Sequence, residues 1–216
     1  MSESKSLNQG RKSAYVARNR AALLRATQEV LAESGSSASV ELVAEKAEIA
    51  VSTIYKHFPN KEALFDAALI GAMLEWEEWT QSVISKTEDP VERLIFPMRL
   101  MVKVPQTHPT FARIVARNPG SFIQAVPRVN FGLGPTAFDL QSLNLLNADK
   151  IEKRIKNLIM VLTLTFVELC TNPELTEDKA IGGISVALEM LGLNTKQIEN
   201  LMSAPLPEID TTKPKL

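Results

Sequence analysis

The sequence predicts an all-α fold of about nine or ten helices. An N-terminal domain of three helices is joined by one long helix to a larger C-terminal helical domain. Three observations predict it. Apolar residues recur at helical spacing along most of the 216 residues, and no segment alternates as a strand would. Residues 61–86 contain no proline, so one continuous helix can join the two parts.

The composition is that of an ordinary globular chain, with 45% hydrophobic and 23% charged residues. The single cysteine, Cys170, excludes an intrachain disulfide and a zinc site built from cysteines. Only two histidines are present, so we expect no metal and no other cofactor. No apolar run is long enough to span a membrane, and residues 1–10 lack an apolar signal segment. We therefore expect a cytoplasmic protein with no membrane partner.

The N-terminal segment is strongly basic. Residues 1–25 contain six lysine or arginine residues and one acid, Glu3, although the whole chain has a net charge of −1. Residues 1–17 show no helical periodicity, and we expect them to form a flexible basic arm. Such an arm can contact a polyanion or can simply be a solvated tail.

Three helices are expected in the first 60 residues. The first runs from Arg18 to a left-handed cap at Gly35. The second follows the N-cap Ser39 and ends near Glu48. The third covers about residues 51–58 and is ended by Pro59.

The remaining elements are defined mostly by their proline breaks. The long helix covers residues 61–86, and the next begins at Asp89-Pro90 and is kinked by Pro97. Residues 105–135 are irregular and contain only short helices. Residues 128–148 give no readable pattern. The expected helices that complete the fold cover residues 111–117, 121–126, 149–170, 176–191 and 195–202, followed by a disordered tail over 204–216.

The two short helices over residues 39–58 are separated by only a few residues, as in a helix-turn-helix motif. Residues 39–65, SVELVAEKAEIAVSTIYKHFPNKEALF, resemble the DNA-binding domain of the tetracycline-repressor (TetR) family of bacterial regulators. Direct matches to the family pattern are Val43, Ala44, Ala47, Thr53, Tyr55, His57, Phe58, Lys61 and Leu64. Two residues depart from it. Glu48 replaces the turn glycine, and Ala50 replaces the serine that caps the recognition helix.

The resemblance implies a set of DNA contacts. Phosphate contacts are expected from Ser39, Thr53, Tyr55, His57 and Lys61. Groove contacts are expected from Ala50, Val51, Ser52 and Lys56, and from Arg18 and Arg20 near the basic arm. Periodicity alone places Val51 in the core, whereas the family pattern places it toward DNA. Tyr55 has an alternative reading as a half-buried packing residue.

Residues 18–64 are then the DNA-binding domain, and residues 65–203 are a ligand-binding and dimerisation domain. Methionine and aromatic residues near kinked helices suit an adaptable apolar pocket. Candidate pocket residues are Trp76, Trp79, Phe96, Met101, Phe111, Phe122, Phe131, Met160 and Phe166. Candidate dimer-interface residues are Leu158, Leu162, Ile184, Leu188 and Leu191. The alternative for the last two long helices is a core pair within one monomer.

These features predict a sequence-specific transcriptional regulator, a repressor that a small apolar or amphipathic ligand releases from DNA. Its expected partners are double-stranded operator DNA, a small-molecule effector and a second copy of the chain. An enzyme is not expected, because no nucleophile–base pair and no glycine-rich phosphate loop is recognisable. The alternative is a helical apolar-ligand-binding protein whose degenerate helix-turn-helix no longer binds DNA.

Overall fold

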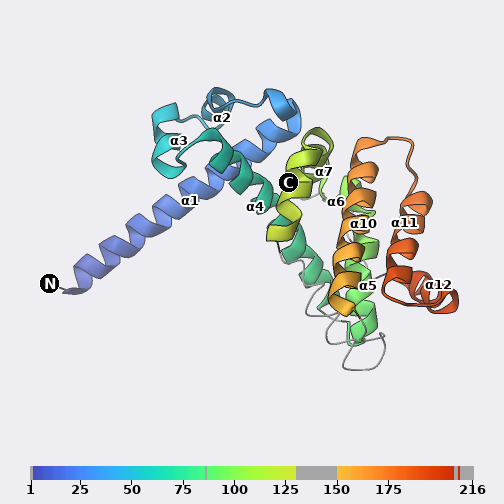
Figure 1. The fold of residues 1–216 in the computed structure, drawn as a ribbon. Coiled ribbons are helices and arrows are strands. Elements are labelled where there is room, and N and C mark those ends of the chain that lie inside the picture. Colours follow the sequence, from blue (N-terminus) through green and yellow to red (C-terminus); the bar gives the residue numbers. More distant parts are fainter. Residues whose placement is uncertain (1, 86, 130–149, 207–208, 210–216) are drawn as a thin grey trace.

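The computed structural model describes residues 2–85, 87–129, 150–206 and 209 (Figure 1). The side chains of residues 2–17 and of residue 36 are not part of that description. Within these ranges the chain forms eleven α-helices and no strand, which confirms the all-α class. The count exceeds the expected nine or ten because the proline-rich middle of the chain folds into more short helices than its pattern indicates.

Helices α1 (Ser2–Ser34), α2 (Val40–Lys46) and α3 (Val51–His57) form the N-terminal domain. Their core is built from apolar side chains that are at most 5% exposed. These are Leu23, Val30, Val43, Ile54 and Phe58. At the surface, Lys46 bridges α2 to α1 by ion pairs with Glu29 and Glu33, with N–O distances of 3.1 and 2.7 Å.

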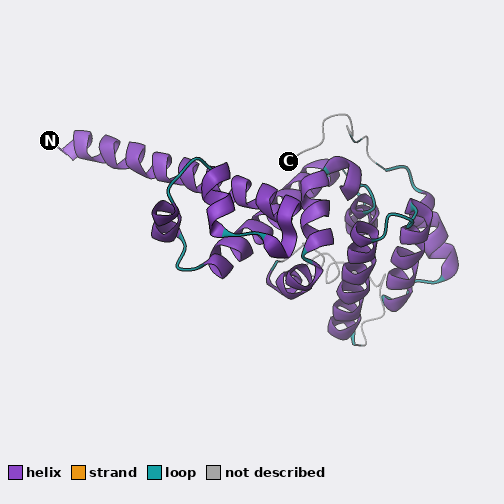
Figure 2. Cartoon of the chain, turned by 90° about the horizontal axis from the view of Figure 1, so that it is seen from above, coloured by secondary structure: helices purple, strands orange, loops and turns teal. Residues whose placement is uncertain are grey.

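Helix α1 begins much earlier than the sequence predicts. It starts at Ser2 rather than near Arg18, and its first half extends away from the rest of the molecule (Figure 2). Residues 2–17 contain no proline, so nothing in the chain stops the helix from continuing beyond its packed part. The role of this segment as a DNA-contacting arm stays a prediction.

The two departures from the family pattern, Glu48 and Ala50, lie in the turn between α2 and α3. Glu48 adopts a positive φ of 53°, where glycine is normally favoured. Ala50 is the N-cap of α3, and no side chain accepts a hydrogen bond there. The chain therefore reaches the turn at a cost of about 1 kcal/mol for each departure.

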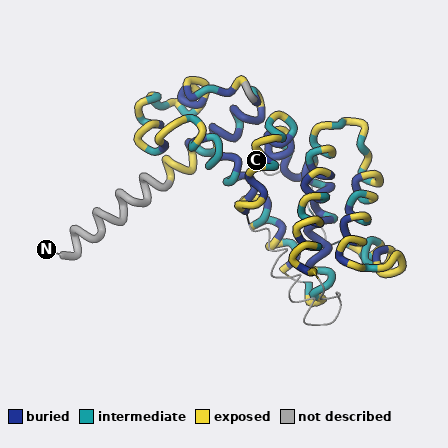
Figure 3. The backbone as a smooth tube through the Cα atoms, viewed as in Figure 1, coloured by how far each residue is buried: buried dark blue, intermediate teal, exposed yellow. Residues whose placement is uncertain are grey.

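Helix α4 (Lys61–Ile84) connects the two domains, capped by Asn60, whose Oδ1 accepts from the N–H of Ala63 at 2.8 Å. It is followed by α5 (Pro90–Met101), which Asp89 caps and which contains Pro97. Buried residues recur along both helices and face the interior (Figure 3). Four short elements come next: α6 (Val104–Thr107), α7 (Pro109–Arg117), α8 (Pro119–Ala125) and the 3-10 turn η2 (Val126–Arg128).

The C-terminal helices are α10 (Ile151–Thr171), α11 (Glu177–Met190) and α12 (Thr195–Ser203), within one or two residues of the expected bounds. Helices α10 and α11 lie side by side and are in close contact (Figure 1). A Cβ atom placed on Gly183 would lie 2.7 Å from Oγ1 of Thr165, so only glycine permits this approach.

The described residues after α12 pack against the domain. Arg99 on α5 donates to the carbonyl oxygens of Leu201 and Ala204, at 3.2 and 2.6 Å, and so holds the end of α12. Leu206 and Ile209 then pack against a small core of Ile84, Phe96 and Leu100. The disorder expected for residues 204–216 therefore does not extend to Leu206 and Ile209, whose apolar side chains find a buried partner surface.

Candidate functional site

The outward surface of α3 is formed by Ser52, Tyr55 and Lys56, all exposed, with Ala50 exposed at its start. Tyr55 is 47% exposed, so about half of its surface is buried, and both the phosphate contact and the packing role stay predictions. Ile54 on the opposite side is only 1% exposed and anchors the helix. The helix thus presents a hydroxyl, a phenol and an ammonium group, with no bidentate amide or guanidinium for a base edge.

The other α3 residues expected to contact DNA are less exposed than Ser52, Tyr55 and Lys56. Thr53 and His57 are partly buried and line a groove between α3 and α1, together with Arg25. Val51 is also partly buried and packs against the core, as its periodicity predicts. Thr53 and His57 therefore lie beside α1, whereas Val51 belongs to the packed side of α3, which corrects its expected position toward DNA.

Two helix N-termini flank this surface. Oγ of Ser39 accepts from the N–H of Leu42 at 3.2 Å and caps α2. Lys61 opens α4, with its Nζ 5.0 Å from the ring centroid of Phe65. The pKa of Glu41 is lowered by a backbone hydrogen bond, then by the bond with Ser39, and also by the charge of Lys61. The two N-termini are therefore close enough to interact electrostatically.

The two arginines of α1 differ in their surroundings. Arg18 and Arg20 are both exposed. The guanidinium carbon of Arg20 lies 5.2 Å from the ring centroid of Phe58, the residue that ends α3. Arg20 is thereby held beside the recognition helix, which suits a phosphate contact.

A cavity of about 60 Å³ lies in the C-terminal domain between α4, α5, α7, α8, η2 and α10. Three phenylalanines from different helices, Phe111, Phe122 and Phe166, form one aromatic cluster in its wall, with ring centroids 5.4–6.0 Å apart. The full lining is Trp76, Glu77, Pro97, Met98, Met101, Phe111, Phe122, Val126, Ile159, Leu162, Thr163 and Phe166.

Five of the nine candidate pocket residues line this cavity, namely Trp76, Met101, Phe111, Phe122 and Phe166. Three do not. Trp79 packs edge-on against His108, with ring centroids 4.8 Å apart. Phe96 belongs to the separate core beneath Leu206, and Met160 is 49% exposed on the outside of α10. These three residues lie on helices that line the cavity, but their side chains are on other faces of those helices. Phe131 lies outside the described residues.

Glu77 is the functional candidate that sequence reasoning misses. Its Oε1 accepts from Nε2 of Gln81 at 2.9 Å. Its Oε2 is buried without a hydrogen-bond partner among the described residues. Burial raises the pKa of Glu77, and the bond with Gln81 only partly offsets that effect. In the sequence this acid sits among Glu75 and Glu78 and looks like part of a solvated face, so only the three-dimensional packing identifies it.

The expected dimer residues are core residues of the protomer. Leu158, Leu162, Ile184, Leu188 and Leu191 are each at most 6% exposed. Periodicity identifies the apolar stripe of each helix correctly, but that stripe faces the protomer's own interior. A different set of apolar side chains is exposed on α10 and α11. These are Met160, Leu164, Val186 and Met190, between 37% and 53% exposed.

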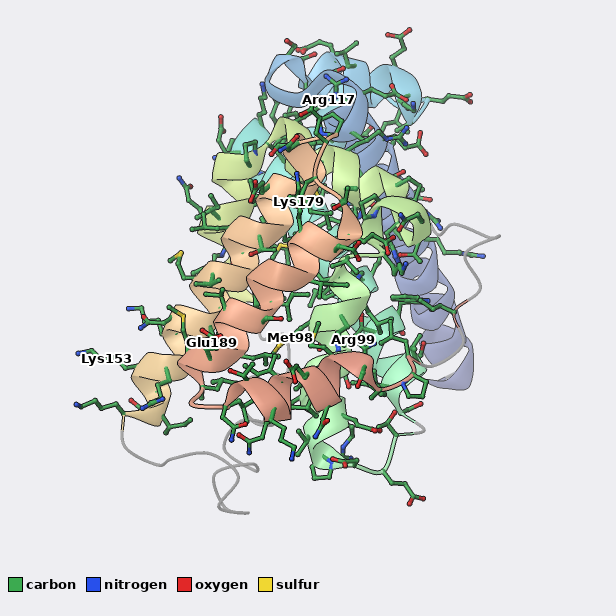
Figure 4. The ribbon with its side chains drawn as sticks, turned by 90° about the vertical axis from the view of Figure 1, so that its right-hand side faces the viewer. Met98, Arg99, Arg117, Lys153, Lys179 and Glu189 are labelled. Atoms are coloured by element: carbon green, nitrogen blue, oxygen red, sulfur yellow. The ribbon has the colours of Figure 1, made fainter. Side chains whose placement is uncertain are left out.

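Figure 4 looks onto α11, with Lys179 and Glu189 at opposite ends of that helix and Lys153 near the start of α10. Charged residues at the ends with apolar residues between them are typical of a protein interface. Glu168 is exposed on α10 and therefore does not face the cavity.

Segments around the cavity also contact the first half of α4 and, through Asn118 and Arg117, the DNA-binding domain. Arg128 at the end of η2 makes a two-pronged ion pair with Asp66 on α4, at 2.5 and 2.7 Å. Asn118, between α7 and α8, donates to the carbonyl of Leu31 on α1 at 3.5 Å. Gly35, with a φ of 54°, packs so closely on Arg117 that a Cβ would lie 2.9 Å from that residue's Cβ.

The described residues contain no helix that is both long and apolar enough to cross a membrane. Within the same part of the chain, no three metal-ligating side chains cluster. Cys170 is largely buried, and burial raises the pKa of its thiol to about 12, so it is an unreactive side chain at neutral pH.

Comparisons with known proteins agree with this geometry. Residues 23–68 match the family model described as bacterial regulatory proteins, tetR family. RolR in complex with resorcinol has a similar fold, with a TM-score of 0.71 and 18% identity, covering 90% of this chain and 97% of RolR. A transcriptional regulator from Rhodococcus sp. Rha1 gives a TM-score of 0.56 and 21% identity, covering 80% of this chain and 95% of the other.

A third similar structure is the fatty acid degradation regulator FadR from Bacillus halodurans, with a TM-score of 0.59 and 16% identity, covering 80% and 98% of the two chains. No curated protein sequence matches the chain. The N-terminal domain is thus a helix-turn-helix with an exposed recognition helix, and residues 23–68 match the DNA-binding part of the TetR family. The fold of the rest of the chain is similar to the folds of the solved structures named above.

Proposed function

We propose that the chain is a dimeric repressor that leaves its operator when a small apolar ligand occupies the cavity. The observation that carries this proposal is the course of α4. Lys61 opens the helix beside the recognition surface, and Trp76 and Glu77 on the same helix line the cavity. Fifteen residues of helix separate Lys61 from Trp76, a distance of roughly 22 Å. A ligand that moves one end of α4 therefore moves the other.

In this proposal, residues 18–64 bind DNA. Ser39, Thr53, Tyr55, His57 and Lys61 contact phosphates, and Arg18 and Arg20 add charge along α1. Ala50, Ser52 and Lys56 face the major groove. Val51, which packs against the core, is excluded from this surface in spite of the family pattern. Because the other three side chains offer few hydrogen bonds to base edges, direct readout is weak and methyl contacts favour thymine. The operator is then an A·T-leaning palindrome whose half-sites are spaced by about 34–36 Å or a multiple of it.

Residues 65–203 bind the ligand and form the dimer in this proposal. The exposed apolar residues of α10 and α11 support a second copy as the occupant of that face. The second copy contributes the second recognition helix, which a palindromic operator requires. Four helices, two from each protomer, then pack against one another.

The apolar wall of the cavity supports an apolar ligand. RolR, which is similar in fold, has been solved in complex with resorcinol. Reversing an occupancy from 99:1 to 1:99 needs about 5.5 kcal/mol of differential affinity. A ligand that buries about 200 Å² more apolar surface in the released form would supply roughly 5 kcal/mol.

The experiment begins with full-length protein and selection of bound duplexes from a random DNA library. The selected duplex is then used to compare the wild type with Met101→Phe, which fills the cavity as a ligand would. We expect Met101→Phe to lower the DNA affinity at least tenfold while circular dichroism remains unchanged. Leu74→Phe is the matched control, because Leu74 lies on α4 and is 50% exposed outside the cavity.

Normal DNA binding by Met101→Phe would show that filling the cavity does not control DNA binding. A second function, a ligand-binding protein without DNA binding, is favoured by the positive φ of Glu48 and the uncapped start of α3. Selection that returns no duplex at low salt would support this alternative and overturn the repressor proposal.

A further inference from the structure

We propose that the ligand of this cavity is a compact ring that carries a hydrogen-bond donor, a hydroxyl or amino group, which binds Oε2 of Glu77. This inference rests on the proposed function, because it names the chemistry of the effector that the regulator senses. It adds a specific polar contact to a cavity that is otherwise apolar.

The carboxylate of Glu77 has unused hydrogen-bonding capacity at the cavity wall. Gln81, one turn further along α4, donates to Oε1 at 2.9 Å and fixes the orientation of the group. Oε2 is buried and has no partner in the described part of the chain. A buried acceptor without a partner is costly, because it has lost water and gained nothing in exchange. A donor on the ligand restores that bond.

The other polar lining groups do not compete for this role. The hydroxyl oxygen of Thr163, whose proton is donated to the carbonyl of Ile159 at 2.7 Å, keeps lone pairs that accept, but it is uncharged and therefore a weaker acceptor than a carboxylate oxygen. The indole of Trp76 is a donor only, so it cannot receive a ligand donor. The facing wall is built from carbon and sulfur atoms of Pro97, Met98 and the phenylalanine cluster. The polar end of the ligand therefore lies toward Glu77 on α4, and its apolar end toward α5 and the phenylalanine cluster.

The volume of the cavity sets the size of the ligand. A core cavity of about 150 Å³ is enough for one benzene molecule. The cavity here has about 60 Å³, so even one ring must displace part of the wall. Met98 and Met101 are the side chains that can move, because methionine has three rotatable bonds and adapts to irregular space. A ligand of several fused rings would require the helices themselves to separate further.

The test uses phenol and toluene as probes, since they have nearly the same shape and differ in the hydroxyl donor. Binding to the full-length wild type is measured by isothermal titration calorimetry. We expect phenol to bind more tightly than toluene, although phenol is better hydrated in water. In Glu77→Leu the preference should reverse, with phenol weakened at least tenfold and toluene unchanged or tighter.

Glu78→Leu is the matched control, because Glu78 is the next residue on α4 and is exposed. It should leave both affinities unchanged. Glu77→Gln preserves the shape and one acceptor, and replaces Glu77→Leu if circular dichroism shows that the latter does not fold. It should reduce the preference for phenol without reversing it. Benzylamine, as a third probe, separates a cationic donor from a neutral one.

Equal affinity for phenol and toluene in the wild type would overturn the inference, as would an unchanged preference in the Glu77 variants. In either case the proposed function stands, because a ligand still binds. If none of the probes binds, the donor inference fails and the sensor part of the proposed function fails with it. If the same protein still selects a duplex, only the DNA-binding part of the proposed function is supported.

Discussion

Two properties of Lys61 suit it to bind an anion. It opens α4, where free backbone N–H groups and the helix dipole favour an anion, and its ammonium group lies over the ring of Phe65. The ring limits the directions in which the side chain can point. A phosphate of the DNA backbone is the anion that such a site would meet on a duplex.

We expect Lys61→Ala to weaken binding to all duplexes by a similar factor, because a phosphate contact carries no sequence information. The slope of log affinity against log salt should fall by about one unit per half-site. Titrations of the selected duplex at several salt concentrations measure both quantities. Lys153→Ala, which removes the same charge from the exposed start of α10, is the control. A changed sequence preference with an unchanged salt slope would contradict the phosphate role.

Gly183 is required by packing rather than by backbone conformation. Its φ is ordinary, but an added methyl group would lie 2.7 Å from Oγ1 and 2.9 Å from Cγ2 of Thr165. We expect Gly183→Ala to lower the free energy of unfolding by about 1–3 kcal/mol, since the two helices must move apart. Gly120→Ala meets no atom within 4 Å and should instead raise it by about 0.5–1 kcal/mol.

Chemical denaturation of both glycine variants provides the measurement. The double variant Gly183→Ala with Thr165→Ala should recover part of the loss, because it removes both clashing atoms. Absence of any recovery would mean that the close approach of α10 to α11 is not what Gly183 serves.

At the scale of elements, α10 and α11 each have two apolar faces with different roles. One face carries Ile184 and Leu188, which are fully buried in the protomer. The other carries Leu164 and Val186, which are 53% and 51% exposed. Helical periodicity detects apolar positions but contains no information on which of two apolar faces meets the protomer's own core. The sequence therefore locates both helices well, but the residues expected at the interface are buried inside the protomer.

We expect Leu164→Asp or Val186→Asp to convert the dimer to a monomer without unfolding it, because the new charge lies on the exposed face. Ile184→Asp should instead unfold the chain, since it places a charge in the core. Sedimentation velocity at micromolar concentration measures the first effect, and circular dichroism measures the second. A wild-type protein that is monomeric under these conditions would contradict the proposed interface.

The helix bounds and the pocket differ in how far local sequence determines them. Helix ends are marked by residues with local effects, such as the caps Ser39, Asn60 and Asp89. The first residues of α2, α4 and α5 are accordingly predicted well. The cavity depends on which side of each helix turns inward. Glu77 is therefore missed, while Trp79 and Met160 are wrongly included.

At the scale of the whole molecule, the two domains are connected by more than α4. The Arg128–Asp66 ion pair joins the cavity side to α4, and Asn118 reaches the carbonyl of Leu31 on α1. A shift of α7 or η2 therefore reaches the DNA-binding domain through two helices at once. This makes rotation of that domain as a unit the expected motion, rather than a bend within it.

The basic N-terminal half of α1 extends beyond the DNA-binding domain (Figure 2). We expect deletion of residues 1–17 to lower DNA affinity and to reduce the preference for A·T flanks, because this segment can follow a narrow minor groove. Competition between A·T-flanked and G·C-flanked duplexes measures the effect. Unchanged affinity and preference would reduce the segment to a solvated extension.

The small volume of the cavity has a kinetic consequence. A wall that must part before a ring can enter makes the association of the ligand depend on how often the wall opens. At high ligand concentration the observed rate then reaches a plateau, which equals the opening rate, instead of rising linearly. The same barrier slows the escape of a bound molecule. A regulator built this way responds to sustained exposure to its effector and is insensitive to brief pulses.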